Sequence, residues 1–169
     1  MVDVALVLFS GSIIGIGATI TFDLWARLLH VALKIPPSNM CLVGRWLRSM
    51  PEGTIRHANI SSSPRMAGEC TIGWIAHYLI GISFAIAFIA MMGVRWLQDP
   101  SLAPAILFGL VTAIAPLFIM QPLFGLGFAS SRAPHPAQAR LRTLMNHAAF
   151  GFGLYLFATL VSWVSRPPS

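Results

Sequence analysis

Residues 72–94 read IGWIAHYLIGISFAIAFIAMMGV, an apolar run without any Asp, Glu, Lys or Arg. A helix needs roughly 20 mainly apolar residues to cross the hydrocarbon core of a bilayer. Three other stretches meet the same criterion: residues 4–22, 102–124 and 144–163. We therefore predict an all-α fold, a bundle of four transmembrane helices. The third stretch contains three prolines, and we expect a kink near Pro116.

The composition supports lipid as the solvent. Hydrophobic residues make up 56% of the chain and charged residues 9%, against about 25% charged in soluble domains. A single transmembrane domain over residues 1–169 is expected. The net charge of +6 is not accompanied by a zinc-finger, RNP or helix-turn-helix motif, so we expect no nucleic-acid partner.

The positive charges divide sharply between the two sides of the predicted bundle. Nine of the eleven Lys and Arg residues lie between spans one and two or between spans three and four: Arg27, Lys34, Arg45, Arg48, Arg56, Arg65, Arg132, Arg140 and Arg142. Only Arg95 and Arg166 fall on the other side. By the positive-inside rule, both termini are expected outside and the two longer loops in the cytoplasm.

The first long loop contains a pattern typical of a short helix. Pro36-Pro37-Ser38 is a helix-start signal with Ser38 as the N-cap. One predicted face is apolar, and Arg45 and Arg48 lie away from it; the apolar residues are Leu42, Val43, Trp46, Leu47 and Met50. This favours an amphipathic helix on the inner membrane surface. A partly ordered loop is the alternative.

The chain has two cysteines, Cys41 and Cys70, without CxxC spacing. Both fall on the side predicted to be cytoplasmic. Because thiols are kept reduced in that compartment, we expect two reduced structural cysteines.

Small and polar residues recur at every fourth position of each span, which predicts close helix packing in lipid. The series are Gly11, Gly15, Thr19, Asp23; Glu69, Gly73, His77, Gly81; Ala113, Leu117, Gln121, Gly125; and His147, Gly151, Tyr155, Thr159. From the helical rise of about 1.5 Å per residue, the polar members reach a similar depth. We predict a cytoplasm-facing polar pocket lined by Asp23, Glu69, His77, Gln121, Asn146 and His147.

A structural interpretation of the same residues competes with this prediction. Asp23 and Arg27 are four residues apart and could pair on one helix. His77 and His147 lie near the interface and could hydrogen-bond neighbouring helices without binding anything. Ionisable residues inside a bilayer nevertheless favour a functional site.

Several short motifs are spread over nearly the whole chain: Gly17-Ala18-Thr19 through Asp23-Leu24-Trp25, Gly44-Arg45-Trp46, Gly68-Glu69, Gly73-Trp74, His77-Tyr78, Gln121-Pro122, Gly125-Leu126-Gly127, His147 and Phe150 to Tyr155. In these motifs the chain resembles a family of small bacterial inner-membrane proteins, a domain of unknown function with four predicted spans. The resemblance implies the bacterial inner membrane and supplies no activity.

Three functions remain open from the sequence. The pocket could bind or conduct a small molecule, proton or cation, with Asp23 or Glu69 as the cation or proton group; a homodimer would then be needed. A redox protein could bind a metal through His77, His147 and Glu69, or haem through the two histidines. The third is a non-catalytic subunit of a larger membrane complex that contacts lipids. No cofactor is specified.

Enzyme motifs give no further guidance. The sequence lacks GxSxG, Walker A and HExxH patterns. A membrane enzyme using Glu69 and His77 for acid/base chemistry stays open, without a substrate.

Overall fold

A computed structural model describes residues 4–164, which contain helices and no strand. The long helices are α1 (Val4–Leu33), α3 (Glu69–Met92) and α7 (Pro136–Val164), and α5 (Leu102–Thr112) continues through a π-helix, η2 (Ala115–Met120), into α6 (Gln121–Leu123). The shorter elements are α2 (Met40–Ser49), η1 (Ile60–Ser62), α4 (Arg95–Gln98) and η3 (Phe128–Ser130). Four helices are long and apolar enough to cross a membrane. The all-α prediction is confirmed.

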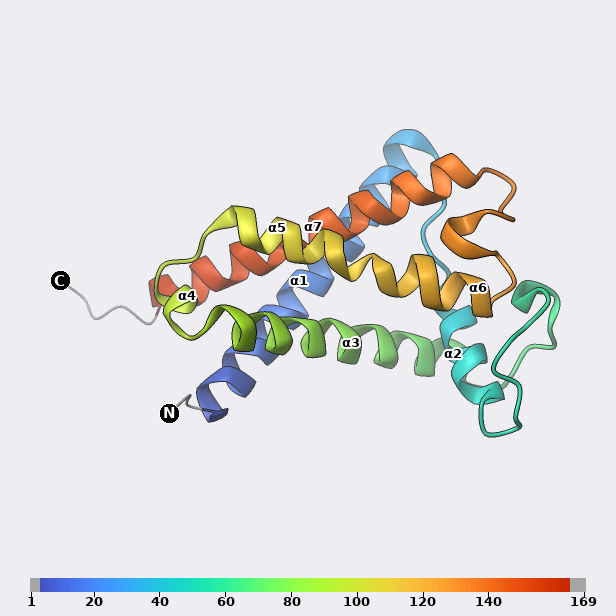
Figure 1. Cartoon of the computed structure of the whole chain (residues 1–169), viewed down its shortest axis with the longest axis horizontal. Coiled ribbons are helices and arrows are strands. Elements are labelled where there is room, and N and C mark those ends of the chain that lie inside the picture. Colours follow the sequence, from blue (N-terminus) through green and yellow to red (C-terminus); the bar gives the residue numbers. More distant parts are fainter. Residues whose placement is uncertain (1–3, 165–169) are drawn as a thin grey trace.

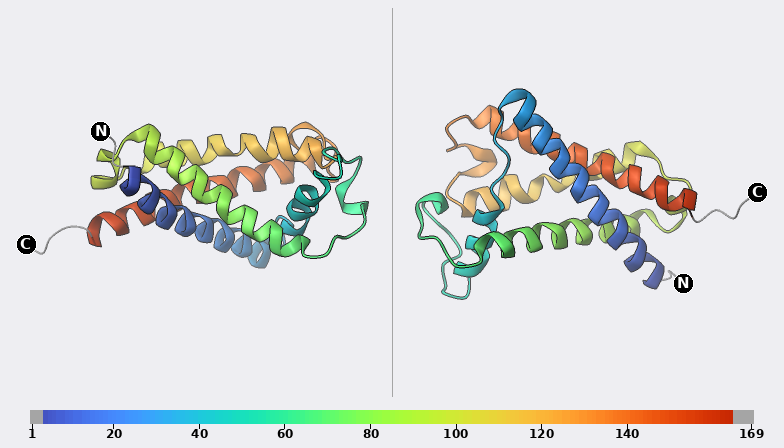
Figure 2. Two further views of the ribbon diagram at one scale, coloured as in Figure 1. Left: turned by 90° about the horizontal axis from the view of Figure 1, so that it is seen from below. Right: turned by 180° about the vertical axis from the view of Figure 1, so that it is seen from behind.

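The helices form one bundle with its irregular segments at the two ends (Figure 1). α1 packs on both α3 and α7, and α5 packs on α7. The second view in Figure 2 shows α1 running obliquely across α3 and α7. α2, α6 and the long loops gather at one end, which we call the α2 end, and α4 lies at the other end (Figure 1).

Glycines allow the long helices to approach closely. A Cβ atom added at Gly15 would lie 2.5 Å from the Cα atom of Ile82 on α3, and one added at Gly151 would lie 2.5 Å from the carbonyl oxygen of Ala105 on α5. Small residues at a crossing let two backbones pack in van der Waals contact. Because α3 already covers Gly11 and Gly15, this face of α1 is used within the chain.

Two helices are longer than the hydropathy of the sequence suggests. α1 extends to Leu33 instead of residue 22, and α7 begins at Pro136 instead of residue 144. The prediction followed apolar character, whereas a helix continues into the polar residues as long as no breaker stops it. Asp23 therefore lies inside α1 and not at its end.

The third span changes its backbone pattern at the predicted proline. Pro116 lies in the π-helix η2, and a proline cannot supply the N–H that a helix would donate to the carbonyl oxygen of Thr112. The span then ends after Leu123, where Gly125 adopts a φ of 87° that suits glycine. Loop one binds this helix end: the His57 N–H donates to the Leu123 carbonyl at 2.8 Å.

The short helix in the first loop is present as α2, so the partly ordered loop is excluded. Its N-cap is Asn39 and not Ser38; the Asn39 side chain accepts a hydrogen bond from the Cys41 N–H at 3.0 Å. The sequence pattern also misjudged which side of α2 is buried. Arg45, placed away from the contact face by the sequence pattern, is 5% exposed because α2 packs that side against α3.

Candidate functional site

A cavity of about 300 Å³ lies at the α2 end of the bundle. Its walls come from α1, α3, η2 and α7, and the segment from Pro37 to Val43 adds a further side. Most of the lining is apolar and includes Phe84 and Phe150. Four of the six predicted site residues line it: His77, Gln121, Asn146 and His147.

Asn146 is, together with Thr19, one of the two most deeply buried polar residues of the cavity wall. Its relative exposure is 1%, and its Oδ1 atom has no hydrogen-bond partner. More than nine in ten buried polar groups in proteins are hydrogen-bonded, because an unpaired one costs about 1–3 kcal/mol. Asn146 thus brings an amide oxygen without a hydrogen-bond partner into the wall of the cavity.

His147 is held in one tautomer by its neighbour on α5. The Thr112 hydroxyl donates its proton to the Gly109 carbonyl at 2.6 Å, and its oxygen lies 2.8 Å from Nδ1 of His147. Since the hydroxyl has a single proton, Nδ1 must be the donor in this contact. In the neutral ring, Nε2 is then a hydrogen-bond acceptor.

Asp23 on α1 contacts His77 and Tyr78 on α3, so it joins these two helices. Its Oδ1 lies 3.0 Å from Nε2 of His77, and its Oδ2 accepts a hydrogen bond from the Tyr78 hydroxyl at 3.1 Å. The alternative pairing with Arg27 is not formed among the described residues. The ring of Phe22 contacts both histidines edge-on, at centroid distances of 5.3 Å from His77 and 5.6 Å from His147.

Two further polar residues border the cavity. Gln121 is buried, and its Oε1 accepts a hydrogen bond from the Ser130 hydroxyl at 2.7 Å. Arg142, on α7, donates from Nη1 to the carbonyl oxygen of Pro36 at 2.8 Å. This contact ties α7 to the segment that precedes α2.

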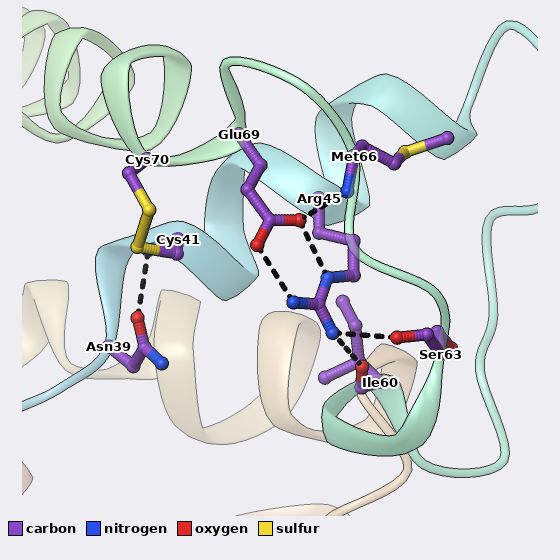
Figure 3. Close-up of polar contacts among 8 residues, drawn as sticks. All are labelled: Asn39, Cys41, Arg45, Ile60, Ser63, Met66, Glu69 and Cys70. Carbon is purple, nitrogen blue, oxygen red and sulfur yellow. Dashed lines mark hydrogen bonds and ion pairs between the residues drawn. A yellow bond between two sulfur atoms is a disulfide. The ribbon is translucent and has the colours of Figure 1, made fainter.

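Glu69, like Asp23, does not line the cavity, and it belongs to a separate polar contact. Figure 3 shows its carboxylate facing the Arg45 guanidinium, with Nε to Oε2 and Nη2 to Oε1 both at 2.8 Å. Arg45 also donates from Nη1 to the carbonyl oxygens of Ile60 and Ser63, each at 2.9 Å. The carboxylate accepts the Met66 N–H as well. Glu69 thus holds α2 and loop one in place and does not line the cavity.

The two cysteines are joined, which corrects the expectation of free thiols. Cys41 on α2 and Cys70 on α3 form a disulfide (Figure 3). Gly44 and Gly73 explain why the two cysteines lie close together, because they let the backbones of α2 and α3 touch. A Cβ atom at either glycine would overlap the backbone of the other helix. The cysteine Cα atoms are 3.8 Å apart, closer than in most disulfides. Nothing in the spacing of the cysteines predicts this crossing.

The predicted metal ligands are not assembled. His77 and His147 line the same cavity, but Glu69 is bound to Arg45 outside it. Within residues 4–164, no three His, Cys, Asp or Glu side chains lie close enough together to hold a metal ion.

Sequence reasoning missed Arg142 and Thr112 as cavity residues. Arg142 precedes Asn146 by four residues, so the helical repeat already placed it on the same face. It was counted only as a loop charge because α7 was expected to begin later. Thr112 carried no such signal.

The fold and its surface define the class of protein. Large apolar side chains cover the outside of the bundle, among them Phe9, Met91 and Leu107, and four helices can span a bilayer. The chain is a multi-pass membrane protein. Residues 12–161 match the family described as "Protein of unknown function (DUF2938)", and the chain belongs to this family. No curated protein and no solved structure matches it.

Proposed function

We propose that this protein binds a small, largely apolar molecule with a polar group in the cavity at the α2 end. The observation that carries the proposal is the buried Asn146 amide, whose Oδ1 has no partner and which lines the cavity. The volume of about 300 Å³ lies at the low end of the range of about 300–1,000 Å³ for ligand pockets.

The polar groups set the specificity of such a site. A molecule that enters from the bilayer gains little from apolar burial, because lipid chains are as apolar as the cavity wall. Hydrogen bonds to Asn146 and to Nε2 of His147 would select it. A site with unpaired buried polar groups discriminates strongly against analogues that cannot pair with them.

Binding of a cation or proton is less well supported. The two carboxylates expected to serve it are engaged: Asp23 by His77 and Tyr78, and Glu69 by Arg45. Metal or haem ligation would use the two histidines, whose rings both contact Phe22. A homodimer and an accessory role in a larger complex remain predictions.

The proposed location follows from the charge bias and the family resemblance. We place the protein in the bacterial inner membrane with both termini on the periplasmic side. The cavity then lies at the cytoplasmic end of the bundle. Arg166, which contributed to the charge count, lies outside the described residues.

The test is to identify what the cavity retains. Protein extracted gently from its native membrane is examined by native mass spectrometry for a stoichiometric bound species. Ala115 lines the cavity, so Ala115→Leu should fill part of it and remove the species. Ala103 is exposed on the same span, and Ala103→Leu is the matched control.

Asn146→Ala should weaken retention of the species through the lost hydrogen bond. If folded Ala115→Leu protein retains the same bound species as the wild type, or if the wild type retains none, the proposal is wrong.

A further inference from the structure

Arg142 is a cation at the cavity without an acidic partner. Residues 4–164 contain four acidic side chains, and none forms an ion pair with it. Asp23 and Glu69 are engaged by other groups, and Asp99 and Glu52 are exposed. The Nε atom of Arg142 is buried and has no hydrogen-bond partner. The described part of the chain therefore leaves the charge of this guanidinium uncompensated.

The wall contributed by α7 changes from charged to apolar along the helix. Arg142, Asn146 and Phe150 are spaced four residues apart, and all three line the cavity. Each step advances about 6 Å along the helix, from the α2 end toward the middle of the bundle. On α3, His77, Gly81 and Phe84 line the cavity at steps of four and three residues, and the order from polar to apolar is the same. A molecule that matches this order has a charged end and an apolar tail.

We propose that the cavity binds a single-chain anionic amphiphile, with its carboxylate or phosphate on Arg142 and its chain toward Phe84 and Phe150. This inference rests on the proposed function. A guanidinium presents N–H donors in a planar fork that matches a carboxylate or phosphate, and such charge-assisted bonds are about twice as strong as neutral ones. The modest volume suits one short chain and not the two chains of a phospholipid.

A purely structural role for Arg142 is the competing interpretation, since it also binds the Pro36 carbonyl. Arg140 provides a matched control, because it lies on the same helix and donates from Nε to the Ala129 carbonyl at 2.7 Å without lining the cavity. Replacing either arginine removes a contact between α7 and a loop carbonyl. Only Arg142→Gln should change the preference for charge.

The experiment uses the full chain in nanodiscs of zwitterionic lipid at an alkaline pH, where the probe carboxylate is ionised. A decanoate carrying a photoreactive diazirine is cross-linked, and the labelled peptides are mapped. Unlabelled decanoate, decyl phosphate, decanol and dioctanoyl phosphatidylglycerol compete. Ala115→Leu reports whether the labelling occurs in the cavity.

We expect decanoate or decyl phosphate to compete at least tenfold better than decanol in the wild type, and whichever of the two wins identifies the headgroup. Arg142→Gln should abolish this preference while decanol competition stays unchanged; Arg142→Lys should keep part of it, and Arg140→Gln all of it. Size-exclusion profiles confirm that each variant is folded.

Equal competition by decanol and the two anions, with labelling still blocked by Ala115→Leu, would overturn the headgroup assignment and leave the cavity proposal standing. Stronger competition by the two-chain phospholipid would overturn the single-chain occupant. Labelling unaffected by Ala115→Leu would overturn the proposed function itself.

Discussion

Arg45 and Glu69 form a buried, two-pronged ion pair that fastens α2 to the start of α3. Their relative exposures are 5% and 6%, and both N···O distances are 2.8 Å. Hydrogen bonding to Glu69 raises the pKa of Arg45 above its ordinary value, so the guanidinium stays charged. Its remaining donors bind loop-one carbonyls. Arg45 thus joins α2 to the start of α3 and to loop one.

Breaking this pair should destabilise the protein strongly. Arg45→Met or Glu69→Gln is expected to cost about 3–5 kcal/mol, because each leaves an uncompensated or poorly paired buried group. Thermal unfolding, monitored by size-exclusion chromatography, measures the loss of stability. Arg56 is exposed, so Arg56→Met is the control and should change the stability by no more than about 0.5 kcal/mol. The double replacement Arg45→Met with Glu69→Met should recover part of the stability. A double variant as unstable as the sum of its singles would contradict this account.

The crossing of α2 and α3 should tolerate no side chain. A Cβ atom at Gly73 would overlap the Met40 carbonyl, and we expect Gly73→Ala to cost about 3 kcal/mol, the upper end of the usual cost of overpacking. Gly53 has open space around it and a φ of 78°, so Gly53→Ala should cost only about 1 kcal/mol of backbone strain. The thermal stabilities of the two variants, measured in the same detergent, decide the point. Similar losses would mean that the close approach is not what holds α2.

The disulfide should add to the same junction. Its two cysteines are 29 residues apart, and closing a loop of that length stabilises a chain by at most about 3–4 kcal/mol. The double variant Cys41→Ser with Cys70→Ser should have a lower thermal stability than the oxidised wild type. Under reducing conditions its thermal stability should equal that of the wild type. Because α2 residues line the cavity, probe binding should weaken in parallel. Equal stability of the variant and the oxidised wild type would show that the ion pair alone fixes α2.

Hydropathy predicts the spans well because lipid imposes a simple requirement on length and polarity. It could not predict the helix ends: α7 begins at Pro136, well before its apolar part. The arrangement of α2 was also beyond it. Arg45 and Glu69 are 24 residues apart, and only the close backbone approach at Gly44 and Gly73 brings their charges together.

The candidate site was predicted in part, for a reason that is visible on the helices. His77 and His147 were placed at a similar depth by counting residues, and both line the cavity. Glu69 shares a face with His77 on α3 by the same count, yet its partner on α2 draws it to another contact. Periodicity identifies the face of a helix but not which neighbouring helix covers it.

The Thr112 hydroxyl should fix the tautomer of His147. We expect nitrogen NMR of selectively labelled protein to show the proton on Nδ1 in the wild type, since the hydroxyl proton is already used on Gly109. Thr112→Val should release this restraint and cost about 1–3 kcal/mol by leaving a polar group unpaired. Thr159→Val is the control, because that hydroxyl bonds only its own helix at Tyr155. A wild-type ring protonated on Nε2 alone would contradict the assignment.

Two observations bear on the orientation of the bundle in the membrane, and they favour opposite sides. Nine of eleven positive charges lie at the α2 end, which predicts a cytoplasmic location, whereas a disulfide at that end is typical of an oxidising compartment. We expect the charges to prevail, because they act while the chain inserts, before the cysteines can pair. A C-terminal alkaline phosphatase fusion should then be active, and a fluorescent-protein fusion dark.

The redox state of Cys41 and Cys70 in growing cells distinguishes the two orientations, because their disulfide is stable only in an oxidising compartment. Rapid alkylation before lysis, followed by mass measurement, reports their state. Cysteines that escape alkylation because they are joined in a disulfide, together with an inactive phosphatase fusion, would place the α2 end in the periplasm. The anionic amphiphile would then enter from that side, because Arg142 lies at the same end of the cavity as α2.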